Sequence, residues 1–582
     1  MAMYIGRTNQ KVMTYARPQV QKVTVTLPKA HHPLEDILSK PAVRKALLWM
    51  TRRGPDGKCF LERLCENYDN PNADFWTRLK WYWSNKAIDL ALKKAGLDKE
   101  TMKKHLFHHT PTVKSLALTA KSIGTYGLTV PQRFTAPLFV VWNITQVCNL
   151  SCKHCYQDAK HKPMPDELTT EEKLDLLDQM ADEYVPFVAF AGGEPLVAKD
   201  LWPVLEHCKK RGFHVTIATN GMLLTPEMCA RLKEVGVKYI EVSIDSINPE
   251  EHDEFRGLKG AWQRSIQGIR NAVAAGIRTG MATCFTRETV HTVDEVVKFA
   301  IDLGCSTFAH FNFIPVGRGK EIMHHDLTPG QRELLMRKLQ RHLAEGKISI
   351  ISTAPQFGRS CIIYGSEEGV FATGHAGKGE GKKTLVLSRY IGGCGAGRCY
   401  CSIQPNGIIN ACVYIPSEEV GDIRRQSFKE IWENALFSVL SDREDRGDHC
   451  GVCDYRHYCG GCRARSLAYT GDIQAGDPGC VYNAHEWIEL TAGADSVMTS
   501  HFAMPSGFSL SAGCGNGCGT SVQTPLVQLK GLRQQAEQLA QIVTSGVVQA
   551  AVRAGEISGV PEEEVRDFDE VVDRLSSLFT KN

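Results

Sequence analysis

The 582-residue sequence has no long hydrophobic run, no excess of charge of one sign and no internal repeat that we detect. No stretch approaches the ~20 consecutive apolar residues of a transmembrane helix, and residues 1–28 lack the apolar core of a secretory signal. The 68 basic and 65 acidic side chains leave a formal charge of only +3, which argues against a nucleic-acid-coating protein. We therefore expect a cytoplasmic protein with no nucleic-acid partner.

The chain carries 43% hydrophobic and 23% charged residues, as ordinary globular domains do. Its length suggests several folding units. We divide it into a helical N-terminal region (1–135), an α/β core (136–327), a linker (328–390), a cysteine-dense domain (391–485) and a tail with a Gly/Cys loop and helices (486–582).

Short apolar runs alternate with helical stretches in the α/β core. A Thr169…Glu172 capping box and Thr225 mark two helix starts. Six such units predict a parallel sheet, curled into a partial (β/α)6 barrel with its chemistry at the carboxyl ends of the strands. The predicted strands are Leu138–Trp142, Phe187–Phe190, Val215–Ala218, Tyr239–Ile244, Gly280–Cys284 and Thr307–Phe313.

Cysteine is the abundant exception, with 21 residues, 14 of them in four clusters between Cys148 and Cys518. Clustered thiols without an export signal indicate metal ligation or redox chemistry. Cys148, Cys152 and Cys155 directly follow the first predicted strand and leave a metal centre one ligand short. Zinc would require a fourth ligand, and His154 lies unfavourably between two of the three, so an iron with an open position is the better interpretation.

This Cys-x3-Cys-x2-Cys pattern, followed by the aromatic Tyr156, resembles the signature of the radical S-adenosylmethionine (SAM) superfamily. The resemblance implies a [4Fe–4S] cluster on the three cysteines, with SAM chelated to the unligated iron. Further segments match the family's SAM contacts at successive strand ends, and these are Gly192-Gly193-Glu194-Pro195, Thr219-Asn220, Ser243, Asp245, Arg256 and Ile314. By resemblance the glycines let carbonyls approach the SAM amino group and Glu194 adds charge there, while Ile314 lies near the adenine.

The cysteine-dense region resembles the SPASM extension of these enzymes. The resemblance implies one auxiliary cluster on Cys394, Cys412, Cys462 and either Cys399 or Cys401, of which we favour Cys401. A second auxiliary cluster would use Cys450, Cys453, Cys459 and Cys480. Two residues rather than three separate Cys459 from Cys462, which departs from the family pattern, and a pair of zinc ribbons remains the alternative.

These features predict a radical SAM enzyme, an oxidoreductase or maturase. SAM would be cleaved to a 5′-deoxyadenosyl radical that abstracts hydrogen from an unactivated C–H of a tetrapyrrole or peptide, while the auxiliary clusters relay electrons. Cys459-Gly460-Gly461-Cys462-Arg463-Ala464-Arg465 looks like the subset acting on tetrapyrroles and ribosomal peptides. Arg463 and Arg465 are candidates to pair with propionates, and the alternative is that both support the clusters or lie at the surface. A low-potential reductant such as ferredoxin or flavodoxin would be a partner.

Two alternatives are a membrane-lipid substrate and a non-catalytic iron–sulfur electron carrier. The basic, aromatic segment 75–83 is either an amphipathic helix packed on the next domain or a helix at a membrane surface. Cys514 and Cys518 lie in a Gly-rich loop without an assigned role. For most of the scattered cysteines we expect buried apolar positions; they are Cys59, Cys65, Cys208, Cys229, Cys284, Cys305 and Cys361.

Overall fold

A computed structural model of the chain describes residues 38–95, 98–365, 370–372, 378–380 and 388–491. The predicted loop with Cys514 and Cys518 and the predicted helices after it lie outside these residues. Among the described helices, none has the length and apolar character needed to cross a membrane.

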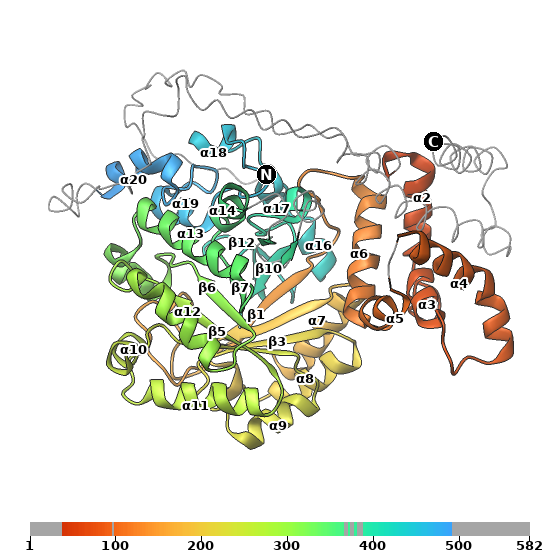
Figure 1. Cartoon of the computed structure of the whole chain (residues 1–582), viewed down its shortest axis with the longest axis horizontal. Coiled ribbons are helices and arrows are strands. Elements are labelled where there is room, and N and C mark those ends of the chain that lie inside the picture. The colour runs from red at the N-terminus through yellow and green to blue at the C-terminus, as the bar shows by residue number, and fades with distance from the viewer. Residues whose placement is uncertain (1–37, 96–97, 366–369, 373–377, 381–387, 492–582) are drawn as a thin grey trace.

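A ten-stranded sheet forms the centre, in the order β12-β11-β10-β1-β2-β3-β4-β5-β6-β7 (Figure 1). Neighbouring strands from β10 to β7 run parallel, and β12 and β7 remain as two separate edges. The α/β fold class with an incomplete barrel is thereby confirmed. The six predicted strands are all present, as β1 Phe139–Thr145, β2 Phe187–Gly192, β3 His214–Thr219, β4 Tyr239–Ser243, β5 Arg278–Cys284 and β6 Thr307–Phe311.

The prediction of six strands was nevertheless incomplete. A seventh parallel strand, β7 (Ser349–Ser352), comes from the predicted linker. The cysteine-dense region adds β10 (Tyr400–Ile403), which pairs in parallel with β1, and then β11 (Ile408–Asn410) and β12 (Glu419–Asp422). The cysteine-dense region is therefore joined to the barrel by backbone hydrogen bonds.

Helices cover the outer face of the sheet (Figure 1). The predicted capping box at Thr169 and Glu172 and the cap at Thr225 begin α7 and α9, since both threonine hydroxyls accept backbone N–H bonds. Outward side chains such as Val140, Ile217 and Ile240 are fully buried beneath these helices. The helices are α7 Thr170–Asp182, α8 Leu201–Lys210, α9 Pro226–Glu234, α10 Pro249–Arg256, α11 Ala261–Ala274, α12 Val293–Asp302, α13 Pro329–Glu345 and α14 Gln356–Tyr364.

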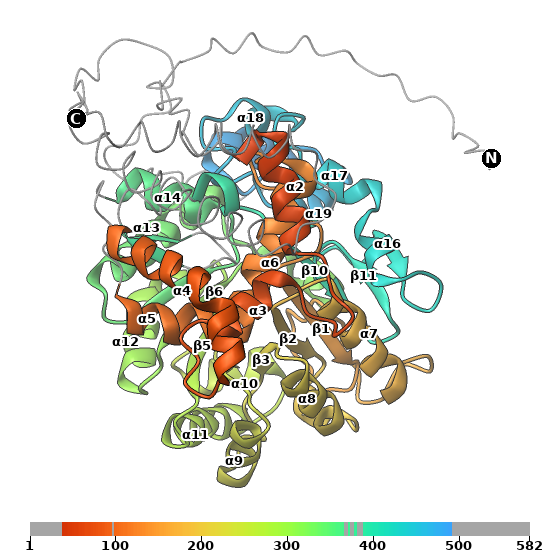
Figure 2. The ribbon, with the colours of Figure 1, turned by 90° about the vertical axis from the view of Figure 1, so that its right-hand side faces the viewer.

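The N-terminal region is helical, as expected, and stands beside the barrel (Figure 2). Its helix α6 packs Ala117 and Leu118 into the main core. A separate small core joins α2, α3 and α4 around Tyr68 and Trp81. The helices are α2 Pro41–Met50, α3 Phe60–Asn67, α4 Phe75–Ala95, α5 Lys99–Met102, a π-helical turn Lys103–Phe107 and α6 Thr110–Tyr126.

Residues after β12 form short helices around the remaining cysteines. Four arginines of the cysteine-dense domain are less than 2% exposed, which is unusual for a charged side chain; they are Arg398 before β10, and Arg443, Arg463 and Arg465 after β12. Such burial requires negative partners nearby. The helices are α16 Phe428–Trp432, α17 Ala435–Ser441, α18 Asp448–Val452, α19 Arg463–Thr470 and α20 Ala484–Thr491.

Candidate active site

Cys148, Cys152 and Cys155 lie in the loop after β1 and line one cavity of about 150 Å³ at the carboxyl ends of the strands. The loop is held at its base, because the Cys148 N–H donates to the Lys160 carbonyl at 2.7 Å. Backbone N–H groups of Leu150 and Ala159 point at the Cys148 and Cys155 sulfurs, at 3.4 and 3.5 Å. Donors aimed at sulfur suit thiolates that ligate a cluster.

Arg256 of α10 brings a positive charge to these thiols. Its Nη1 lies 3.7 Å from the Cys152 sulfur, and its Nε donates to Asp245 Oδ2 at 2.6 Å. Asp245 follows β4, and its other oxygen accepts the Cys284 N–H at 3.0 Å. Burial raises the pKa of Cys148 to about 12, so a metal must displace a proton there. Asp245 and Arg256, expected as SAM contacts, line the cavity but are bound to each other and to the cysteine loop.

The Gly192-Gly193 turn ends β2 against the cysteine loop. A Cβ atom on Gly193 would lie 2.0 Å from the Val147 carbonyl oxygen, and one on Gly192 would lie 2.6 Å from that of Thr145. Gly192 also has a φ of 126°, which other residues rarely adopt. The two glycines are therefore required for close approach between the β1 and β2 ends, and both line the cavity.

Glu194 joins β2 to β3 through its carboxylate. It accepts hydrogen bonds from the Thr219 hydroxyl at 2.7 Å, the Asn220 N–H at 2.9 Å and the Leu196 N–H at 3.1 Å. A carboxylate has about four acceptor positions, and three donors already occupy those of Glu194. Little acceptor capacity therefore remains for the expected interaction with SAM. Glu194, Thr219 and Asn220 line the cavity, whereas Pro195 is buried in the short 3-10 helix that follows.

A second cavity of about 300 Å³ continues from the first into the barrel. Tyr156, Glu241, Ile314 and Tyr414 line both cavities. Tyr156 donates to Asn143 Oδ1 at 3.2 Å and packs edge-on against Tyr414, with 5.1 Å between ring centroids. Ser243 lines only the first cavity. The far wall of the second contains Cys394, Cys412 and Cys462, so this cavity lies between two groups of cysteines.

Glu241 is a residue of both cavities that the sequence analysis missed. It lies on β4 between Tyr239 and Ser243, which line the same interior, and it is 8% exposed. Its carboxylate accepts a hydrogen bond from the Tyr239 hydroxyl at 3.3 Å. Burial raises the pKa of this carboxyl to about 7. The signal in the sequence was a glutamate in an otherwise apolar strand, at a position whose side chain faces the barrel interior. That signal could have identified Glu241 as a candidate site residue.

Cys399 and Cys401 lie apart from Cys394, Cys412 and Cys462. In the pairing of β10 with β1, Tyr400 is opposite Phe139 and Cys401 is opposite Val140. Tyr400 and Phe139 line the second cavity, and alternation of strand side chains points Cys401 to the other face. Both Cys399 and Cys401 belong to the main hydrophobic core. This packing does not support our choice of Cys401 as fourth ligand.

Cys450, Cys453, Cys459 and Cys480 line a separate small pocket, as the proposed second set requires. Arg359 of α14 lines the same pocket and is 1% exposed. Its Nε and Nη1 atoms have no hydrogen-bond partner among the described residues. The nearby cysteines and Glu333 hold the pKa of Arg359 well above its ordinary value, against the effect of burial. Arg359 is paired with Glu333 through Nη2, and a buried cation with two further free donors beside four thiols fits an anionic iron–sulfur cluster.

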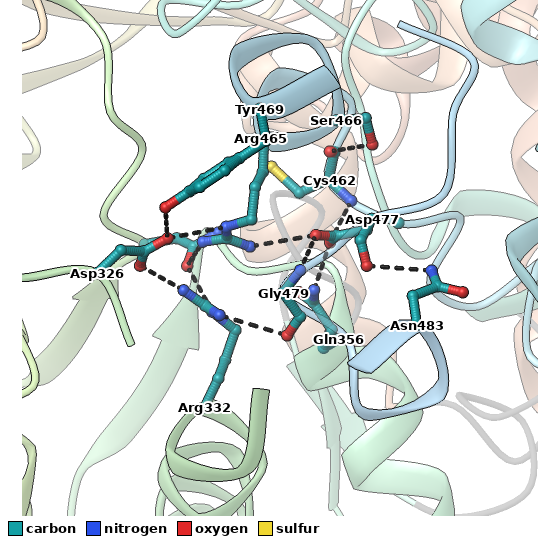
Figure 3. A network of polar contacts seen from close by, with 12 residues as sticks. Asp326, Arg332, Gln356, Cys462, Arg465, Ser466, Tyr469, Asp477, Gly479 and Asn483 are labelled. Carbon is teal, nitrogen blue, oxygen red and sulfur yellow. Dashed lines mark hydrogen bonds and ion pairs between the residues drawn. The ribbon is translucent and has the colours of Figure 1, made fainter. Parts of the chain in front are cut away.

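Arg465 does not face the second cavity, which corrects the expectation that it pairs with substrate. Figure 3 shows it between Asp326 and Asp477, with its guanidinium nitrogens 3.4 and 3.5 Å from their carboxylates. It also donates to the Asn312 side chain and to the Phe313 carbonyl, at 2.6 and 2.9 Å. Arg465 therefore connects the cysteine-dense domain to the barrel.

Arg463, in contrast, lines the second cavity. Its Nη1 donates to the carbonyls of Ile473 and Ala475, at 3.0 and 2.7 Å. Its Nε and Nη2 have no partner among the described residues. A Cβ atom on Gly461 would lie 2.4 Å from Arg463 Nη2 and 3.0 Å from the Cys450 sulfur, so this donor lies on the side of the second cysteine set.

In the part of the chain that the structure describes, no three His, Cys, Asp or Glu side chains are close enough to share one metal ion. In a cluster each thiolate binds a different iron, so its ligands need not converge on one point. Of the seven scattered cysteines, all are buried as expected, and Cys284 in addition lines the first cavity.

Comparison with known proteins gives two family matches and several relatives. The radical SAM superfamily model matches residues 142–300, and the SPASM iron–sulfur cluster-binding domain matches residues 394–462. An AdoMet-dependent heme synthase of Methanosarcina barkeri is 34% identical over 349 residues, which cover 60% of this chain and 97% of the relative. The mycofactocin maturase MftC of Mycobacterium tuberculosis is 28% identical over 358 residues, covering 60% and 84%.

A solved structure shares the fold. The crystal structure of Streptococcus suis SuiB bound to the precursor peptide SuiA has a TM-score of 0.52 and 16% identity, and the match covers 72% of this chain and 92% of SuiB. From the family matches and the full-length heme synthase relative, we conclude that the chain is an enzyme of the radical SAM superfamily with a SPASM domain, and that its cofactors are SAM and iron–sulfur clusters.

Proposed function

We propose that the enzyme modifies an unactivated C–H group of a tetrapyrrole. When bound, the barrel cluster and SAM supply a 5′-deoxyadenosyl radical that abstracts hydrogen. Cys148, Cys152 and Cys155 would hold this cluster, and Arg256 would balance its charge. Gly192, Gly193, Thr219, Asn220, Ser243 and Ile314 form walls against which SAM would be oriented. Which residues ligate and contact these cofactors is part of the proposal.

The observation that supports this proposal is the junction of the two cavities. A substrate in the second cavity would meet the first across Tyr156, Ile314 and Tyr414 and would be enclosed on its far side by Cys394, Cys412 and Cys462. An enclosed position keeps water and stray hydrogen donors from a reactive radical. It also places the substrate between the proposed SAM site and the proposed first auxiliary cluster, which suits removal of an electron from the product radical.

Three observations favour a tetrapyrrole. Apolar and aromatic residues make up most of the lining of the second cavity, including Phe139, Val141, Ile351 and Tyr400. Arg463 is the arginine in the lining of the same cavity and brings a positive charge that suits a carboxylate. The heme synthase relative is matched over nearly its whole length. A peptide substrate is the second candidate, favoured by the maturase relative.

Anaerobic reconstitution tests the chemistry. We expect iron and labile sulfide for more than one [4Fe–4S] cluster, and 5′-deoxyadenosine after addition of dithionite and SAM. Zinc without labile sulfide would contradict the cluster assignment. Absence of SAM binding in calorimetry would favour the non-catalytic electron carrier.

Substrate class is tested by binding of an iron tetrapyrrole with free propionates, followed by its absorption spectrum. Arg463→Met should weaken binding about 10- to 100-fold, the worth of a charge-assisted hydrogen bond. The methyl-ester form of the tetrapyrrole should bind both proteins alike and serves as the control. No binding of either form would favour the peptide.

The remaining expectations are proposals of the same kind. The reaction needs a low-potential reductant, for which ferredoxin or flavodoxin is suited, and a cytoplasmic location is part of the same proposal. The boundaries at residues 135, 327, 390 and 485 also stay predictions. A membrane-lipid substrate remains the alternative within the same chemistry.

A further inference from the structure

Helix α4 exposes an aromatic face. Phe75, Trp76, Tyr82 and Trp83 are 69%, 74%, 47% and 73% exposed, and Leu79 between them is 55% exposed. These are the only aromatic side chains among the large exposed hydrophobic residues of the described chain. Their spacing at i, i+1, i+4, i+7 and i+8 puts all five on one side of the helix.

The opposite side of α4 is firmly packed. Trp81, Ile88 and Leu92 are buried in the small core with Phe60, Leu64 and Tyr68. The Trp81 ring lies 5.4 Å from that of Phe60. At the start of the helix, Asp74 accepts hydrogen bonds from the Thr77 N–H and hydroxyl, at 3.0 and 2.7 Å. The exposed side is therefore held in a fixed orientation.

Helix α4 lies at the outer edge of the molecule, on the side away from the barrel (Figure 1). The residues that pack against it belong to the N-terminal region, from Ala42 to Phe107. The segment is thus an amphipathic helix, as expected. Its buried side packs on the N-terminal region itself and not on the next domain.

The charges along α4 are strongly one-sided. Residues 75–95 contain five lysines or arginines and one aspartate. Arg78, Lys80, Lys86 and Lys93 are exposed. Lys86 Nζ lies 5.7 Å from the centre of the Tyr82 ring, so cationic and aromatic groups share this surface. A surface of this kind complements an apolar layer covered by negative headgroups.

Tryptophan and tyrosine with flanking lysines are typical of side chains at the boundary between lipid headgroups and acyl chains. A helix with this composition lies in that boundary and does not cross it. A soluble protein partner would more often meet an aromatic surface with few charges at its centre. The net positive charge is unfavourable for a second copy of the same face.

We propose that the aromatic face of α4 binds the enzyme to the surface of an anionic phospholipid membrane. The apolar side chains would enter the headgroup boundary, and the lysines would attract the negative headgroups. This inference is independent of the proposed substrate, because it concerns a face remote from the two cavities. It holds for a tetrapyrrole, a peptide or a lipid substrate.

Flotation of the full-length, cluster-loaded enzyme with phospholipid vesicles tests it. The wild type should float with vesicles containing phosphatidylglycerol and much less with pure phosphatidylcholine. High salt should weaken binding, because it shortens the range of charge attraction from ~10 Å at 0.1 M to ~3 Å at 1 M. The triple variant Phe75→Ala, Trp76→Ala, Trp83→Ala should lose at least about 100-fold in partitioning.

The matched control is the variant Leu334→Ala, Ile488→Ala, which removes apolar side chains that are 45% and 47% exposed on other helices. It should bind vesicles like the wild type. All proteins should keep the same circular dichroism and the same cluster absorption, which shows that they are folded. A wild type that stays unbound, or a triple variant that binds normally, would overturn the proposal. So would a dimer that the triple variant converts to a monomer without any vesicle binding.

Discussion

Arg256 is the cation that lies against a proposed ligand of the barrel cluster, at 3.7 Å from the Cys152 sulfur. Its position is fixed by the ion pair with Asp245, and both side chains are at least nine-tenths buried. A positive charge beside a cluster ligand stabilises the reduced, more negative state. Arg256 is therefore placed to adjust the reduction potential as well as to hold the loop.

Arg256→Met should lower the midpoint potential of the barrel cluster by at least about 60 mV, the one-electron equivalent of 1.4 kcal/mol. Arg256→Lys should recover part of the shift because it keeps the charge. Redox titration followed by electron paramagnetic resonance measures the effect. The exposed Arg270→Met serves as control, and equal potentials in all four proteins would disprove this role.

Glu241 gives the protein a carboxyl whose pKa of about 7 lies well above the ordinary value of 4.5. Because the fold favours the neutral form, its contribution to stability is complete below pH 4.5. That contribution is lost as the pH rises from 4.5 to about 7, where the carboxyl ionises inside the barrel. Cofactor-free enzyme should show this loss most clearly.

Glu241→Gln should therefore be more stable than the wild type at pH 8, by up to about 3 kcal/mol, and nearly equal to it at pH 5. Denaturant unfolding at the two pH values measures the difference. Glu321→Gln, at an exposed glutamate, should follow the wild type at both. A constant difference between Glu241→Gln and wild type would contradict the shifted ionisation.

At the scale of elements, α19 connects the cysteine-dense domain to the barrel. It begins directly after Cys462 and inserts Arg465 between Asp326 and Asp477 (Figure 3). Asp477 also accepts the Cys462 N–H at 2.8 Å, and its own N–H points at the Cys450 sulfur at 3.4 Å. One buried network thus joins members of both proposed auxiliary sets to the barrel.

Arg465→Met should destabilise the enzyme by about 3–5 kcal/mol, because two buried carboxylates lose their shared counterion. Adding Asp477→Asn should cost less than the sum of the single changes, since the pair is coupled. Thermal or denaturant unfolding of the three variants measures this. Lys298→Met removes a surface ion pair with Asp302 and should cost at most about 1 kcal/mol. Additive losses would refute the network.

Among the strands, β1 to β6 could be predicted from the sequence, whereas β7 and β10 could not. Six strands and their polar carboxyl ends follow from apolar runs, because a parallel strand buried on both sides reads as one run. Strands β7 and β10 have only four residues each, and β10 interrupts its apolar pattern with Cys401 and Ser402. Both strands join the sheet through contacts with residues far away in the sequence. The local periodicity of apolar residues contains no information about such contacts.

The site shows the same division. Cys148, Cys152 and Cys155 were predicted from their spacing together with the resemblance to the family signature, and all three line one cavity because they lie in one short loop. The burial of Arg465, the three donors on Glu194 and the outward direction of Cys401 depend on sheet register and domain packing. These are set by residues far away in the sequence, so side-chain type did not reveal them.

At the scale of the whole molecule, the barrel and the cysteine-dense domain differ in what stabilises them. The barrel has a continuous apolar core, whereas the region after β12 has short helices, buried arginines and nine-tenths-buried cysteines. Charged groups of one sign buried together require the opposite charge, which the clusters would provide. The two parts should therefore respond differently to loss of iron.

Removal of iron by anaerobic chelation should raise backbone hydrogen exchange in residues 443–480 far more than in β2 to β5. Hydrogen-exchange mass spectrometry measures both regions in one sample. Reconstitution with iron and sulfide should restore protection, whereas zinc should not. Equal exchange with and without iron would show that the domain folds without its clusters.

The pairing of β10 with β1 also has a consequence for synthesis of the chain. Until residues 400–403 leave the ribosome, β1 is an unpaired edge strand of the sheet. Its free N–H and C=O groups can pair with another extended segment. More than 250 residues separate the two strands in the sequence, so this vulnerable interval spans the translation of the entire barrel. A polypeptide that ends before β10 should accordingly precipitate or recruit chaperones, even though every residue proposed to contact SAM is already present.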